Sequence, residues 1–146
     1  VCGCGRRGCL ETVASATGMT RLGRQWLADG RATAYRGAPE DLSTKVLHDL
    51  ALAGDEMALS VFREAGEALG MVLTGAFNLL GLEGVVIGGG AARAYDFIVP
   101  RISEIVSEHM VVTSPERIKI LRCALDEDAP LAGGAFLAAQ AVNPPL

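Results

Sequence analysis

The 146 residues include 13 Lys and Arg and 17 Asp and Glu, which gives a formal net charge of −4, and half of the residues are apolar. This composition excludes intrinsic disorder, and the length suits one domain with a substantial core. Interspersed charges argue against nucleic-acid binding through a broad basic face. Because no apolar run approaches the ~20 residues of a membrane span, we expect a soluble, cytoplasmic protein with no membrane partner.

Three cysteines, Cys2, Cys4 and Cys9, open the chain and are separated by glycines. Zinc takes thiolate ligands readily and prefers four of them in a tetrahedron, and glycine allows the tight turns that would let the sulfurs converge. The spacing therefore favours a zinc site over a disulfide or an unliganded glycine-rich turn, since Cys2 and Cys4 are too close in sequence for an easy bridge. A fourth ligand would come from upstream residues, from a distant residue or from water.

His48 and His109 are the histidines of the chain and are candidates for that fourth ligand. Lone histidines on amphipathic helices are more often surface or capping groups, and the position of His109 near a helix end suits the helix dipole. Cys123, alone in an apolar run, is most simply a buried small hydrophobe. Because a metal loop rarely begins at the second residue of a chain, we also expect a C-terminal fragment of a larger protein.

Helical patterns follow the cysteine loop. Thr20 is the expected cap of a helix over 21–28, Ser43 of a helix over 44–53, and Asp55 of a long helix that reaches residue 80. Trp26 and Phe62 are expected in the core. In the long helix, glycines 66, 70 and 75 suggest close packing against another backbone, and its second half is expected to be buried on most sides.

Residues 85–87 are β-branched without alternation, which predicts a strand buried on both faces. Gly88, Gly89 and Gly90 follow directly, and then a helix is expected over 91–108, a second strand over 118–123 and a final helix over 131–141. A strand that runs through glycines into a helix suits contact with a nucleotide phosphate, although this signal alone is weak and matches neither GxGxxG nor a P-loop. Alternating strands and helices predict an α/β fold with a small sheet.

The cysteine motif CxCGxxGCLE, followed by about 75 residues of helix and then by a strand ending in GGG, resembles the ROK family of repressors, open reading frames and sugar kinases. The resemblance covers essentially the whole chain; residues 10–18 and 85–90 look most like the bacterial glucokinases, and residues 128–135 are similar to the family's C-terminal segment. It implies an actin-like (RNase H-like) two-lobed sugar kinase with nucleotide and sugar in the cleft. Residues 1–146 would then be a single domain, most of the C-terminal lobe without the N-terminal lobe.

The resemblance also implies roles for individual residues. The three N-terminal cysteines match the family's structural zinc thiolates, whose fourth ligand is an upstream His, and Glu11 matches a glutamate that binds sugar hydroxyls. The nucleotide-proximal residues are Gly88, Gly89 and Gly90. The family's catalytic aspartate has no counterpart here, so no catalytic residue is expected in this chain, and the acidic turn Asp126, Glu127 and Asp128 is not assigned that role.

The resemblance therefore implies a kinase that uses ATP and Mg²⁺ to phosphorylate a hexose, most simply glucose at its 6-hydroxyl. The fragment alone would be inactive and the whole protein a homodimer. An alternative is a sugar-responsive repressor that binds DNA through a helix-turn-helix upstream of this segment. A third is a zinc-stapled module without activity.

Overall fold

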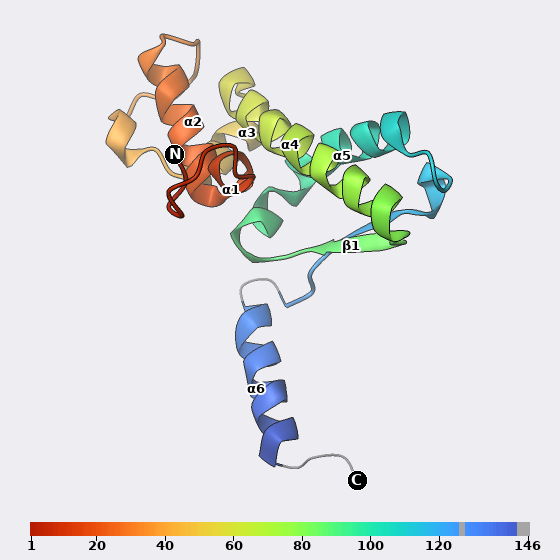
Figure 1. The fold of residues 1–146 in the computed structure, drawn as a ribbon. Helices are drawn as coiled ribbons and strands as arrows, with labels where there is room; N and C mark the ends of the chain where they lie inside the picture. Colours follow the sequence, from red (N-terminus) through yellow and green to blue (C-terminus); the bar gives the residue numbers. More distant parts are fainter. Residues whose placement is uncertain (126–127, 143–146) are drawn as a thin grey trace.

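The computed structural model describes residues 1–125 and 128–142, with only the backbone of Gly90 and Ala91, as helices around a small parallel sheet (Figure 1). The elements in chain order are α1 (Glu11–Ala14), α2 (Ala16–Ala28), η1 (Pro39–Asp41), α3 (Thr44–Leu52), α4 (Glu56–Leu80), β1 (Gly84–Ile87), η2 (Gly89–Ala94), α5 (Tyr95–His109), η3 (Pro115–Arg117), β2 (Lys119–Arg122) and α6 (Ala129–Val142).

Side-chain caps fix where the helices begin. The predictions for Ser43 and Asp55 are confirmed, because their side chains accept hydrogen bonds from the backbone N–H groups of Val46 and Ala58. The prediction for Thr20 was wrong. The helix α2 begins five residues earlier, because extended Ser15 places its Oγ 3.0 Å from the N–H of Gly18 and caps the first turn.

The longest helix, α4, contacts α1, α2, α3 and α5, and α5 runs beside it (Figure 1). Two glycines make this close approach possible: a Cβ on Gly66 would lie 2.7 Å from the carbonyl oxygen of Ile98, and one on Gly70 would lie 2.9 Å from the Cβ of Ile105. Gly75 has nothing within 4 Å, so close packing is confirmed at two of the three glycines.

The second half of α4 is less covered than its sequence predicts. Val72 is 53% exposed and Leu79 is 83% exposed, whereas Phe77 on the opposite face is buried. The expectation of burial on most sides was wrong, because no described element covers the side chains of Val72 and Leu79.

The sheet has two parallel strands in the register Val86 opposite Leu121. Its inner face packs on the core through residues such as Val85 and Ile120, while Val86 is 61% and Leu121 51% exposed on the outer face. The predicted burial of this strand on both faces is therefore wrong for the described residues. The β-branched composition predicted the strand correctly, but it did not predict which faces of the strand other elements cover.

The connection from β1 to β2 passes through η2 and α5. Residues 91–94, expected to start the helix, continue the 3-10 turn η2, and α5 starts at Tyr95, whose hydroxyl donates to the carbonyl of Ile120 at 2.8 Å. The core contains Trp26 and Phe62 as predicted, whereas α6 has no buried residue. None of the described helices is long and apolar enough to cross a membrane.

Candidate functional site

The three N-terminal thiols converge as the sequence predicts. The Sγ atoms of Cys2, Cys4 and Cys9 all lie within 4.8 Å of one another, and those of Cys4 and Cys9 are 3.6 Å apart. Gly5 and Gly8 have φ angles of 82° and 77°, so the turns that bring the sulfurs together use backbone conformations that favour glycine. Tetrahedral zinc with bonds of about 2.3 Å to sulfur separates its thiolates by about 3.8 Å, so this donor set fits the ion.

Hydrogen bonds in the thiol cluster shift the pKa values of Cys4 and Cys9 in opposite directions. The backbone of Arg6, followed by the thiols of Cys2 and Cys9, lowers the pKa of Cys4, while the thiol of Cys4 raises the pKa of Cys9. Within the described part of the chain the cluster contains these three residues and no histidine, so neither His48 nor His109 joins it. The cluster would hold zinc through three thiolates.

The cysteine loop is tied directly to the helix that carries Glu11. Thr12 donates both its hydroxyl and its backbone N–H to the carbonyl oxygen of Cys9, at 2.7 and 2.9 Å. Glu11, the first residue of α1, is exposed. A Cβ on Gly18 would lie 2.7 Å from the backbone of Thr12, so α1 and the start of α2 are in close contact. Zinc in the loop would therefore hold α1, and with it Glu11, in place.

The glycine turn after β1 borders a pocket of about 660 Å³. Gly88 is extended, and Gly89 lies in the left-handed region with φ at +66°. Gly89 is one of the residues that line the pocket. Gly88 instead lies next to Cys123, because a Cβ added to Gly88 would be 3.3 Å from the Cβ of Cys123. Cys123 is half-buried rather than buried, and it pairs with the end of β1 through its N–H to Ile87.

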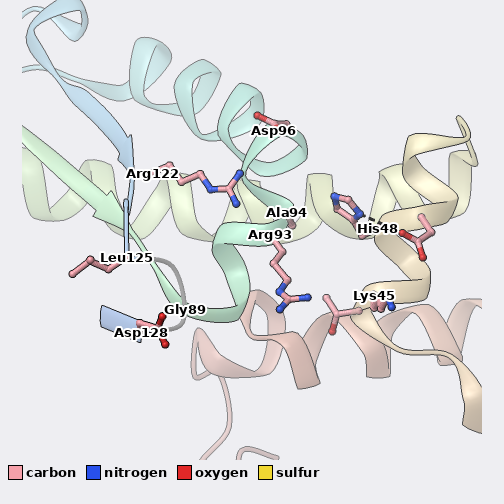
Figure 2. A pocket seen from close by; sticks show the side chains of 11 residues that line it. Lys45, His48, Gly89, Arg93, Ala94, Asp96, Arg122, Leu125 and Asp128 are labelled. Carbon is pink, nitrogen blue, oxygen red and sulfur yellow. Dashed lines mark ion pairs between the residues drawn. The ribbon is translucent and has the colours of Figure 1, made fainter. Parts of the chain in front are cut away.

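Side chains from four elements complete this pocket, as Figure 2 shows. The lining residues beside Gly89 come from α3, from η2 and the first turn of α5, and from the end of β2 and the segment after it: Thr44, Lys45, His48, Asp49, Arg93, Ala94, Asp96, Arg122, Leu125 and Asp128. Of the acidic turn, only Asp128 can be placed at the pocket, because Asp126 and Glu127 lie outside the described residues.

The helix α3 is the part of this pocket that sequence reasoning missed. Its lining residues occupy positions i, i+1, i+4 and i+5 of one face, while Leu47 and Ala51 on the other face are buried in the core. That polar face was visible in the sequence, but nothing local indicated that it would lie opposite a glycine turn 40 residues later.

Glu11 does not line the Gly89 pocket, so among the described residues the structure does not bring the two into one cavity. A second pocket, of about 510 Å³, lies nearer to α1, between α2 and the start of α3. Its arginines serve the fold: Arg21 donates to the carbonyl of Thr12 and Arg24 to that of Leu42.

Comparison with known proteins gives the family of the chain. The ROK family model matches residues 1–141. The chain belongs to the ROK family. Over 140 residues it is 33% identical to a glucokinase of Thermotoga maritima, covering 94% of this chain and 44% of that protein. It is also 27% identical over 136 residues to the DNA-binding transcriptional repressor Mlc of Escherichia coli, covering 93% of this chain and 33% of Mlc.

A solved structure of similar fold is that of a ROK family glucokinase from Streptomyces griseus in complex with glucose and AMPPNP. The match has a TM-score of 0.77 at 26% identity and covers 95% of this chain and 47% of that one. The fold is thus that of part of a ROK sugar kinase, helix-rich with a small parallel sheet. The chain spans less than half the length of the relatives described here.

Proposed function

We propose that the whole protein to which this chain belongs is a sugar kinase that transfers the γ-phosphoryl group of ATP to a hexose, most simply to the 6-hydroxyl of glucose. The observation that carries the proposal is the pocket beside Gly89, at the point where a strand runs through glycines into η2. A backbone without Cβ allows close approach of a nucleotide. The glucokinase relative and the family member bound to glucose and an ATP analogue support the same reaction.

In this proposal the chain supplies binding and positioning. Gly88, Gly89 and Gly90 form the turn that passes close to the nucleotide, which Mg²⁺ accompanies, and the exposed Glu11 accepts hydrogen bonds from sugar hydroxyls, since an ionised carboxylate only accepts. Zinc held by Cys2, Cys4 and Cys9 fixes the loop that carries Glu11 through the hydrogen bonds of Thr12 to Cys9. We also propose that the whole protein forms a homodimer. The aspartate that removes the proton from the sugar hydroxyl lies outside these residues.

A second candidate is a sugar-responsive repressor, which the similarity to Mlc favours. Both candidates share sugar binding and zinc, so the deciding measurement is turnover. The intact natural protein is incubated with ATP, Mg²⁺ and each of a panel of hexoses and N-acetylhexosamines, and ADP release and the phosphorylated position are measured. Turnover with a hexose, fastest with glucose, supports the kinase. Sugar binding without turnover, together with sugar-sensitive binding to DNA, refutes it in favour of the repressor.

A further inference from the structure

His48 lies at the end of a row of aromatic rings that runs from the core to the Gly89 pocket. Phe62, which is fully buried, stacks on Phe97 with ring centroids 5.4 Å apart and planes 17° apart. Phe97 in turn meets the imidazole of His48 edge-on, at 5.5 Å and 77°. Figure 2 shows the imidazole extending from α3 toward the side of the pocket formed by Ala94. The core therefore fixes the orientation of this ring.

The imidazole of His48 is open to a ligand. Its side chain is 31% exposed, and its Nδ1 lies 3.6 Å from Oδ1 of Asp49. That separation is longer than a hydrogen bond. Among the described residues the ring nitrogens make no hydrogen bond, so a polar edge and part of the ring face remain for a bound molecule. Because the ring is already held by Phe97, binding would cost little side-chain entropy.

The charges around the Gly89 pocket suit the nucleoside end of a nucleotide. Among the described lining residues three are cationic, Lys45, Arg93 and Arg122, and three are carboxylates, Asp49, Asp96 and Asp128. A site for a triphosphate gains from an excess of positive charge, which this balanced set does not provide. A purine nucleoside is uncharged, and it offers a flat ring together with acceptor nitrogens, which an imidazole matches by ring contact and by its N–H.

We infer that His48 is a specificity-determining residue that contacts the base of a purine nucleotide in the Gly89 pocket. This inference rests on the proposed function, because it takes the phosphoryl donor to be the ligand of that pocket. The inference adds to the proposed function the part of the phosphoryl donor that α3 recognises, which is the base, and the residue that contacts it, which is His48. The triphosphate then extends away from α3, so His48 affects donor affinity without affecting the sugar.

The test compares His48→Ala with the wild type in the intact protein, using ATP, adenosine and inorganic tripolyphosphate as probes. We expect the KM for ATP and the inhibition constant of adenosine to rise roughly tenfold, the size of a lost contact between a base and an aromatic ring. The hexose KM, kcat and inhibition by tripolyphosphate should stay within about twofold, since none of them involves the base. His109→Ala, which removes a half-exposed imidazole outside the pocket, is the matched control and should change none of these values.

A second variant keeps the test decisive if His48→Ala unfolds. His48→Phe retains a ring against Phe97 and should keep about half of the wild-type adenosine affinity, as judged by calorimetry beside a thermal unfolding curve. Unchanged adenosine affinity in the folded variants would overturn the inference, and so would an equal loss of tripolyphosphate binding. A wild type that binds adenosine through His48 but phosphorylates no hexose would refute the proposed function alone. If the protein phosphorylates a hexose but His48→Ala leaves its ATP KM unchanged, the inference alone is refuted.

Discussion

Asp55 shows how much a single buried carboxylate organises in this fold. It is 8% exposed, and besides capping α4 it accepts hydrogen bonds from the hydroxyl of Thr33 at 2.8 Å and from the N–H of Ala34 at 2.6 Å. One side chain thus joins the segment after α2 to the start of α4. The sequence predicted the cap, but the contacts with Thr33 and Ala34 depend on a loop whose path no local pattern specifies.

Asp55→Asn should therefore lower the free energy of unfolding by about 1–3 kcal/mol, because the amide replaces a charged acceptor of several hydrogen bonds with a neutral one. Urea unfolding at pH 7 measures this difference. Asp49→Asn, on an exposed carboxylate of α3, is the control and should change the unfolding free energy by less than about 0.5 kcal/mol.

The same carboxylate makes stability depend on pH. Burial acts to raise the pKa of Asp55, but hydrogen bonds from Ala34, Ala58 and Thr33 outweigh it and lower the pKa. The folded pKa lies below the unfolded value of about 3.9, so the stabilisation is complete above that pH and is lost as the pH falls through the folded pKa. The gap in unfolding free energy between wild type and Asp55→Asn should therefore shrink as the pH falls below the unfolded pKa. A gap that stays constant as the pH falls would contradict the assignment.

At the scale of elements, the crossing of α4 and α5 explains two glycines that helix propensity disfavours. We expect Gly66→Ala to destabilise the protein by about 1–3 kcal/mol, because its methyl group would meet the backbone of Ile98. Gly75→Ala is the matched control in the same helix. With nothing within 4 Å, it should stabilise by up to about 1 kcal/mol through helix propensity alone. Equal effects of the two substitutions in urea unfolding would show that the contact with α5 is unimportant.

At this scale the sequence predicted features that depend on local residues and failed on features that depend on distant neighbours. The elements with local signals, such as the caps Ser43 and Asp55 and the β-branched strand, were found within a few residues. Burial of the second half of α4 and of Val86 was predicted wrongly, because composition reports an element but not which neighbours cover it. The role of α3 at the pocket was missed for the same reason, since its partner Gly89 is distant in sequence.

At the scale of the whole molecule, the motif that identified the family also predicts its metal content. The intact protein should contain about one zinc per chain, and Cys4→Ser should lower that content because it removes one of three thiolates. Elemental analysis measures it, with Cys123→Ser as the control that leaves zinc unchanged. Loss of zinc should also raise the sugar KM through the link from Cys9 to Thr12. Equal zinc contents in the wild type and both variants would exclude the thiol cluster as the metal site.

The most direct test of the account is the ATP KM of Gly89→Ala in the intact protein, measured with saturating hexose. Gly89 combines a φ of +66° with a place in the pocket lining, so an added methyl group distorts the turn where the nucleotide approaches. We expect the ATP KM to rise at least about tenfold while the hexose KM stays within about twofold. Gly54→Ala, with a φ of +81° outside the pocket, matches the strain and should leave both constants unchanged. An unchanged ATP KM in Gly89→Ala, or a rise in the hexose KM instead, would contradict the assignment of this pocket to the nucleotide.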